Sequence, residues 1–230
     1  MNSYHQQRDE IIRFGRMLYE RGFIAATDGN ISIRLDEHLL LVTPTCLCKG
    51  MMTPEDLVVV DLNGRKLEGM RDVSSELAMH LLIYRMRPDV HAIVHAHPPT
   101  ATGFAAAGIA LDTPLVSEVV LTVGKIPLAS YGCPGTPELS NSLRPLIPDH
   151  SAILMANHGV VTYGEDITRA FMNMETVEHF AKITLVTRTL GQQKVLAPEE
   201  VKKLEAIREK SEAARREGNS QRPKLEAVGS

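Results

Sequence analysis

Cysteines are scarce in this sequence, and none of them form a Cys-x-x-Cys motif. Only Cys46, Cys48 and Cys133 occur among the 230 residues. An odd number without that motif argues against a disulfide framework and against a zinc knuckle. We therefore expect reduced thiols.

Long apolar runs and an excess of charge of either sign are also absent. No apolar run approaches the roughly 18–20 residues that a membrane span needs, and Met1–Glu10 is too polar for a signal peptide. The 25 basic residues nearly balance the 28 acidic ones, so no overall field favours nucleic acid or a membrane. We expect a cytoplasmic protein in which any anion site is local.

The apolar pattern mixes helices and strands without a regular βαβ rhythm. Residues 9–21 have helical spacing, whereas residues 31–35 alternate as a strand should and are followed by a partner strand at 39–42. Three residues between these strands suit a hairpin. Further helices are predicted at 77 to before Pro88, 100–107, 137–143 and 167–190, and a strand at 57–60. The pattern predicts an α/β fold with a mixed, largely antiparallel sheet.

The composition changes beyond Pro198. Residues 199–216 are mostly charged and residues 217–230 are rich in Gly, Ser, Pro and Gln. We predict one domain over residues 1–196, followed at 197–230 by a charged surface helix that frays into disorder.

The run Ala92–Ala96 predicts a strand that carries His95 and is followed closely by His97. Side chains two residues apart point to the same face, so both imidazoles can share one metal ion. Pro98 and Pro99 end the strand, which places the pair where a ligand can enter. The alternative is that these histidines only pack at a strand end.

His158 is the best candidate for a third ligand, because it follows another buried-looking run, 153–161, and Gly159 permits a turn that aims the ring inward. Three neutral histidines leave a zinc ion with its full positive charge and an open position. That arrangement suits a Lewis-acid site better than a structural one.

Ser74, Ser75 and Glu76 stand at the start of the helix that precedes the histidine strand. Two hydroxyls at a helix N-terminus favour an anion. Glu76 is a candidate acid/base group. The alternative for all three residues is capping of the helix alone.

Five short motifs occur in the order seen in class II, metal-dependent, sugar-phosphate aldolases. They are Gly29-Asn30, Thr43-Pro44-Thr45, Ser74-Ser75-Glu76, His95-Ala96-His97 and Asn157-His158-Gly159. The sequence resembles the class II aldolase/adducin family over residues 9–190. The resemblance implies a three-layer α/β/α domain and a lyase that cleaves a ketose 1-phosphate to dihydroxyacetone phosphate and an aldehyde. L-fuculose 1-phosphate or a 5-deoxypentulose 1-phosphate would be its substrate.

The resemblance also implies roles for individual residues. One Zn²⁺ per chain, or alternatively another divalent transition metal, would be held by His95, His97 and His158. Glu76 would act as the base, and contact between Glu76 and the metal in the resting state is an open alternative. The implied phosphate cradle consists of Gly29, Asn30, Thr45, Cys46, Ser74 and Ser75. A homotetramer with active sites at subunit boundaries is implied as well.

Two departures from the family pattern affect these expectations. Cys46 stands where the family has glycine. The family's tyrosine acid aligns with Val116, and no tyrosine follows Tyr163. The proton donor on the aldehyde side is therefore open between Glu118 and Tyr131, although Tyr131 could simply be packed. The apolar stretch 115–123 around Glu118 suits a subunit boundary or a buried strand.

Other functions in the same superfamily compete with aldol cleavage. Methylthioribulose 1-phosphate dehydratases also use three histidines and a glutamate. Pentulose-phosphate 4-epimerases have aspartate in the position of Glu76, which argues against that activity. An adducin-like interaction module would need no catalysis, and intact ligands argue against it.

Overall fold

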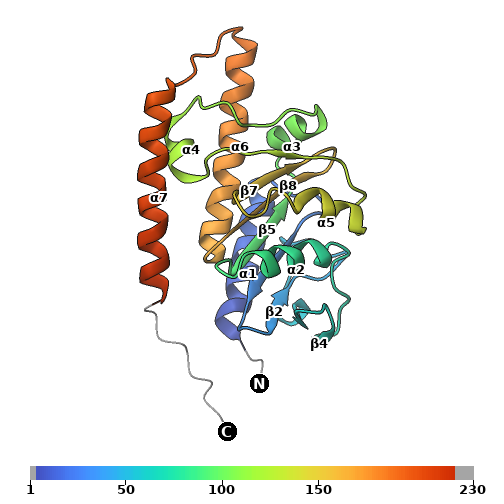
Figure 1. Ribbon diagram of the computed structural model, residues 1–230. Coiled ribbons are helices and arrows are strands. Elements are labelled where there is room, and N and C mark those ends of the chain that lie inside the picture. Colours follow the sequence, from blue (N-terminus) through green and yellow to red (C-terminus); the bar gives the residue numbers. More distant parts are fainter. Residues whose placement is uncertain (1–3, 221–230) are drawn as a thin grey trace.

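A single sheet runs through the centre of the molecule with helices on both faces (Figure 1). The computed structural model describes residues 4–220, with side chains to residue 214. The sheet has eight strands in the order β4-β3-β2-β1-β5-β8-β7-β6, and all neighbours are antiparallel except the parallel pair β6 and β7. The strands are β1 Asn30–Arg34, β2 Leu39–Val42, β3 Val58–Asp61, β4 Lys66–Glu68, β5 Ala92–Ala96, β6 Leu128–Ala129, β7 Ala152–Met155 and β8 Gly159–Gly164.

Helices cover the two faces of the sheet separately. One face packs against α1 (His5–Glu20), α3 (Pro99–Ala106) and α6 (Ile167–Thr189), and the other against α2 (Leu77–Met86) and α5 (Pro137–Leu143). The remaining elements are α4 (Ser117–Thr122), α7 (Pro198–Ser220) and a 3-10 turn, η1 (Pro54–Asp56). The predicted three-layer α/β/α class is confirmed.

Strand alternation explains why there are two cores. In β5, Ala92 and Val94 face the core under α1 and α6, whereas Ile93 faces the core under α2 and α5. A fully buried valine or isoleucine side chain contributes about 1.5–3 kcal/mol. His95 follows the alternation and lies on the α2 side, and this register brings it opposite Asn30 of β1.

The local structure differs from the sequence analysis at four places. The strands β4 and β6 were missed, because β4 is exposed at all its residues and β6 has only two. The run 153–161 is two strands, β7 and β8, and His158 lies in the turn between them. Residues 117–122 form the helix α4 rather than a strand, because Val119 and Val120 are buried on one side while Glu118 is exposed.

The charged C-terminal region begins with a helix. The helix α7 continues to Ser220, and Arg208 donates a hydrogen bond to the Val120 carbonyl of α4 at 3.3 Å. The predicted disorder concerns residues 217–230, of which 221–230 lie outside the described residues. Within residues 4–220, no helix combines the length and apolarity needed to cross a membrane.

Candidate metal centre and active site

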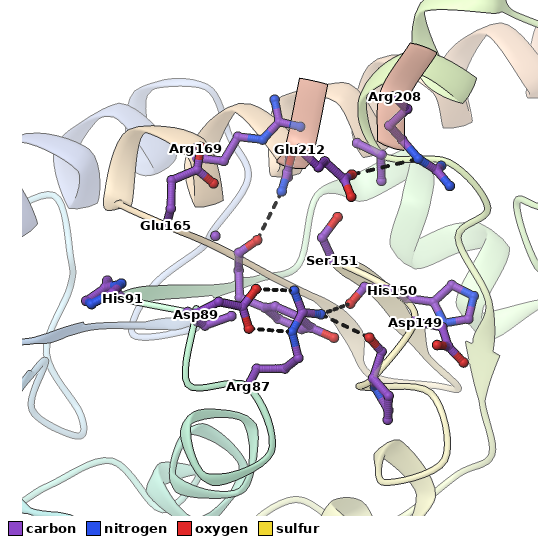
Figure 2. Close-up of a pocket in the computed structure, with 16 residues that line it drawn as sticks. Arg87, Asp89, His91, Asp149, His150, Ser151, Glu165, Arg169, Arg208 and Glu212 are labelled. Carbon is purple, nitrogen blue, oxygen red and sulfur yellow. Dashed lines mark hydrogen bonds and ion pairs between the residues drawn. The ribbon is translucent and has the colours of Figure 1, made fainter. Parts of the chain in front are cut away.

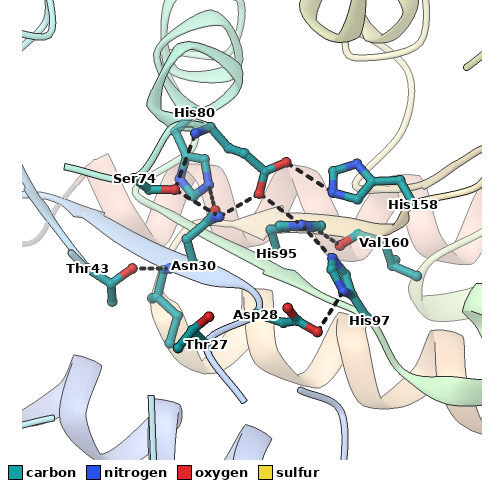
Figure 3. A network of polar contacts seen from close by, with 12 residues as sticks. Thr27, Asp28, Asn30, Thr43, Ser74, His80, His95, His97, His158 and Val160 are labelled. Carbon is teal, nitrogen blue, oxygen red and sulfur yellow. Dashed lines mark hydrogen bonds and ion pairs between the residues drawn. The ribbon is translucent and has the colours of Figure 1, made fainter. Parts of the chain in front are cut away.

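Three histidine rings meet at the end of β5. His95 is the penultimate residue of the strand, His97 follows it, and Pro98 prevents the strand from continuing. The ring centroid of His95 lies 4.9 Å from that of His97 and 4.8 Å from that of His158. One nitrogen from each ring lies within 4.8 Å of the others. Figure 3 shows the three rings gathered together. The structure thus brings together the three predicted metal ligands.

The turn between β7 and β8 delivers His158. Asn157 adopts a positive φ of 53° just before it, a conformation that asparagine tolerates better than most residues. An added Cβ on Gly159 would overlap Cδ2 of the His97 ring. Glycine is therefore required here so that the second strand can approach the histidine cluster.

Glu76 directs its carboxylate at the histidines rather than at the helix. It occupies the N-cap position of α2, yet its side chain makes no capping hydrogen bond. Its Oε2 lies 3.2 Å from His95 Nε2, and its Oε1 lies 3.1 Å from His158 Nε2. Burial alone would raise the pKa of Glu76, but His95 and His158 hold that pKa far below its usual range. Capping alone is thus the wrong interpretation of Glu76.

The donor set suits a cation. His95 Nδ1 contacts the Val160 carbonyl at 2.9 Å, so its Nε2 faces His97 Nε2 at 3.1 Å. The pKa of His97 is lowered to about 4 by burial and by the charges of His95 and His158, so the His97 ring is neutral near pH 7. Although burial would lower it, Glu76 raises the pKa of His95. The Glu76 carboxylate therefore favours a positive charge between the rings. A divalent metal would supply that charge in place of a proton.

An unsatisfied acceptor at the same point supports this fit. Glu76 Oε1 is buried and accepts no well-formed hydrogen bond from any residue within 4–220, although His158 Nε2 is 3.1 Å away. A buried anionic oxygen without a donor is costly. A cation shared with the histidines would remove that cost.

Asn30 and Gly29 connect the centre to the predicted phosphate cradle. The Asn30 amide donates to Glu76 Oε2 at 2.8 Å and to the Ser74 hydroxyl at 3.3 Å. Gly29 has a φ of +69°, and a Cβ there would lie 2.7 Å from the His95 carbonyl. Only glycine fits both conditions, so the family motif Gly29-Asn30 has a steric reason in this chain.

The other predicted cradle residues lie on loops beside Ser74. The Thr45 amide donates to the Asp72 carbonyl at 3.0 Å, which ties the Thr45 loop to the segment that leads into Ser74 and Ser75. Cys46 has a φ of +53°, a conformation for which glycine is favoured. The glycine that the resemblance implies at this position would suit this backbone conformation, and Cys46 adopts it with an exposed thiol.

The two candidates for the aldehyde-side proton donor stand apart from the histidines. Glu118 is exposed on α4 and Tyr131 has 60% of its surface exposed on a loop. The expectation of a packed Tyr131 was wrong. Among the described residues, no hydrogen bond or ion pair joins either side chain to the cluster.

Two residues that sequence reasoning missed contact the site. The Asp28 carboxylate lies 3.4 Å from His97 Nδ1, on the side of the ring away from His95, where a carboxylate commonly orients a metal-binding histidine. His80 contacts Asn30 Oδ1 through its Nε2 at 2.5 Å. The spacing Glu76, His80, Tyr84 was the available signal for His80, because it places polar residues on one face of a helix that is otherwise apolar.

A cavity of about 400 Å³ lies at the opposite end of β5, where Val90 and His91 precede the strand (Figure 2). Its arginines already have partners. Arg87 pairs with Asp89 at 2.7 Å, and Arg208 contacts Glu212 at 3.7 Å. Neither the position of this cavity at the start of β5 nor the ion pairs of its arginines connect it to the histidine centre.

The arrangement of motifs matches a known protein family. The model of the family described as class II aldolase and adducin N-terminal domain matches residues 9–185. The chain belongs to this family. The resemblance expected from five motifs is thereby confirmed, and so is the assignment to an enzyme class of lyases.

Relatives in this aldolase family cover most of the chain. The 5-deoxy-D-ribulose 1-phosphate aldolase of Bacillus thuringiensis serovar kurstaki is 36% identical over 201 residues, which are 86% of this chain and 93% of that protein. The 3-oxo-tetronate 4-phosphate decarboxylase of Pectobacterium atrosepticum is 36% identical over 200 residues, 85% of this chain and 89% of that protein. A solved structure of an L-fuculose 1-phosphate aldolase superposes with a TM-score of 0.84 at 32% identity and covers 91% of this chain and 98% of its own.

Proposed function

We propose that this protein is a metal-dependent aldolase that reversibly cleaves a ketose 1-phosphate to dihydroxyacetone phosphate and an aldehyde. L-fuculose 1-phosphate and 5-deoxypentulose 1-phosphates are the substrates to test first. The observation that carries the proposal is the cluster of three imidazoles, two of which contact the Glu76 carboxylate, beside the polar side chains of Asn30 and Ser74. Relatives named for both aldolase activities support it.

The chain's own residues have distinct tasks in this proposal. His95, His97 and His158 would hold Zn²⁺. When bound, the metal supplies Lewis-acid stabilisation of negative charge on the ketone fragment. Glu76 removes the C3 proton of dihydroxyacetone phosphate in synthesis and returns it in cleavage. Its buried position excludes water, and Asn30 holds its Oε2 in one orientation.

The phosphate group would be held by the cradle of Gly29, Asn30, Thr45, Cys46, Ser74 and Ser75. Ser75 is exposed and Ser74 is partly exposed at the entrance to α2, so both hydroxyls are accessible to an anion. We also propose residues 1–196 as the catalytic domain, a homotetramer with sites at subunit boundaries, and a cytoplasmic location.

Ser75→Ala is expected to raise KM for a phosphorylated substrate and to leave KM for its unphosphorylated analogue unchanged. Loss of one charge-assisted hydrogen bond costs about 1.5–3 kcal/mol, or roughly a 10-fold to 150-fold rise in KM. Steady-state kinetics with both substrates measure the change in KM, with a variant of the partly exposed Ser140, Ser140→Ala, as control. An equal effect on both substrates would contradict phosphate recognition.

Glu118→Gln tests the proton donor on the aldehyde side. If Glu118 reaches the centre of a neighbouring subunit, the variant is expected to lose about 100-fold in carbon–carbon cleavage. Exchange of the C3 proton of dihydroxyacetone phosphate should remain, because only the aldehyde half needs that donor. Light scattering must then show an oligomer. Unchanged cleavage would move the assignment to Tyr131, and an active monomer would exclude a shared site.

Decarboxylation of a 3-oxo acid phosphate is the second candidate, and one structural observation favours it. Within residues 4–220 no acid other than Glu76 and Asp28 contacts the histidines. Loss of CO₂ also leaves negative charge beside a carbonyl but needs no aldehyde-side proton donor. A relative is named for that activity.

One panel separates the candidate activities. Purified protein is analysed for bound metal and assayed for release of dihydroxyacetone phosphate from ketose 1-phosphates, and for release of CO₂ from 3-oxo-tetronate 4-phosphate. Methylthioribulose 1-phosphate and pentulose 5-phosphates test dehydration and 4-epimerisation. Release of dihydroxyacetone phosphate supports the aldolase. Inactivity on every compound of the panel would favour an adducin-like interaction module.

A further inference from the structure

A row of buried polar side chains leads from Glu76 into the core, away from the histidines. Glu76, His80 and Tyr84 recur every four residues and share one face of α2 and its N-terminus. Asn30 and Ser32 alternate on β1 and face them. Each of these residues is at most 8% exposed, and Ser32 is fully buried. Buried polar groups are costly unless they are paired, so this row requires an explanation.

Short contacts join the row without a break. Asn30 Nδ2 lies 2.8 Å from Glu76 Oε2, and Asn30 Oδ1 lies 2.5 Å from His80 Nε2. The contact between Asn30 and His80 is drawn in Figure 3. His80 Nδ1 lies 2.6 Å from the Ser32 hydroxyl, which lies 2.9 Å from the Tyr84 hydroxyl. Each contact has hydrogen-bonding distance.

The chemistry of the two ends determines the direction of every hydrogen bond. The ionised Glu76 only accepts, so Asn30 presents its NH₂ group to Glu76 and its carbonyl oxygen to His80. His80 Nε2 must then carry the proton. Burial and the charge of His95 lower the pKa of His80 to about 3, so the ring is neutral and its Nδ1 is an acceptor. Ser32 therefore donates to Nδ1.

The hydrogen bond between Tyr84 and Ser32, at the far end of the row, points in the same direction. Burial raises the pKa of Tyr84 well above its usual range, so its hydroxyl keeps its proton and donates to Ser32. All donors in the row therefore point toward Glu76. Such an aligned chain strengthens each of its hydrogen bonds.

The row also determines the orientation of the Ser74 hydroxyl group. The Ser74 oxygen lies 3.3 Å from the second Asn30 N–H and 3.2 Å from the Glu76 backbone N–H, and both groups donate to it. With both lone pairs occupied, the Ser74 proton is free to donate to an anion. A reversed Asn30 amide would remove a donor from Glu76 and from Ser74 at once.

We propose that His80 is a positioning residue that locks the Asn30 amide, so that one N–H holds the Glu76 carboxylate and the other turns the Ser74 hydroxyl outward to a phosphate. Ser32 and Tyr84 lock the tautomer of His80 in turn. The inference rests on the proposed function for the roles of Glu76 as base and Ser74 as phosphate donor. The direction of the hydrogen bonds in the row does not depend on that function.

The tautomer of His80 is a direct test on the unaltered protein. Side-chain ¹⁵N NMR of the full chain, labelled at histidine and assigned with His80→Gln, is recorded between pH 6 and 8. We expect a neutral ring with the proton on Nε2 and an acceptor Nδ1. A proton on Nδ1, or a charged ring, would overturn the proposal.

Two variants of similar size test the consequence for activity. In Gln the amide nitrogen reaches the position of His80 Nε2, whereas in Asn it reaches only that of Nδ1. His80→Gln is expected to keep kcat for C3 proton exchange within about threefold. His80→Asn should lower kcat about 10-fold to 100-fold, as loss of an outer hydrogen-bond partner commonly does, and raise KM for the phosphorylated substrate.

Thermal unfolding and metal content are measured in parallel, with Tyr163→Phe as control. The Tyr163 hydroxyl is also buried but donates to the Ile147 carbonyl outside the row, so its loss should leave kcat within about twofold. A merely structural role would make kcat follow Tm across the three variants. Equal losses in His80→Gln and His80→Asn, or unchanged kcat in His80→Asn, would overturn the proposal. If the unaltered enzyme processes no sugar phosphate, the proposed function fails, and the NMR result still decides the direction of the row.

Discussion

Replacing His95 or His97 with alanine is expected to abolish metal binding and activity together. Each imidazole supplies one of three neutral donors that meet around a single point. Two remaining histidines cannot complete the coordination that a catalytic zinc needs. Since metal stabilisation of the transition state is worth several kcal/mol and each 1.4 kcal/mol is tenfold in rate, we expect a loss of about 1,000-fold or more.

The two substitutions differ in their structural cost. His95 is fully buried between β1 and β8, whereas His97 has about a quarter of its side chain exposed. His97→Ala therefore creates less of a cavity and is the cleaner test. Elemental analysis gives metal per chain, and the exposed His38→Ala serves as control. Full activity in a metal-free His95→Ala, His97→Ala double variant would contradict the proposed centre.

Glu76→Gln is expected to abolish both cleavage and C3 proton exchange while metal remains bound. The amide keeps the shape of the carboxylate but cannot take a proton, and general-base catalysis contributes about 10²–10⁴-fold. The contrast with Glu118→Gln is informative, because that variant should lose cleavage alone. Isotope exchange into dihydroxyacetone phosphate and an aldehyde-release assay measure the two steps.

Metal content makes the Glu76 result interpretable. The carboxylate contacts His95 and His158, so a loss of metal in Glu76→Gln would assign it to binding rather than to proton transfer. The exposed Glu199→Gln in the first turn of α7 is a matched control. Undiminished proton exchange in Glu76→Gln would show that Glu76 is not the base.

Local patterns predicted the elements whose side chains show a clear period. The helices α1 and α6 and the strands β1, β2 and β5 lie close to their expected positions, because each buries one face or one stripe. Exposed β4 and the two-residue β6 have no such pattern, and pairing with a neighbouring strand is what defines them. The valines of α4 suggested a strand. However, β-branched residues favour strands only where their side chains pack against those of neighbouring strands.

The sequence by itself determined the chemistry of the centre: two histidines beside a strand-ending proline pair, a third before Gly159, and a carboxylate at a helix start. The tertiary structure alone decided how these groups face one another. Asn30 lies opposite His95 through the register of β1 and β5, and Glu76 turns to the rings instead of capping α2. The same applies to Asp28 beside His97 and to the donor row that ends at Glu76. These contacts join residues 19 to 82 positions apart in the chain. A local pattern carries no information about such contacts, because they arise only when the sheet, its loops and α2 pack together.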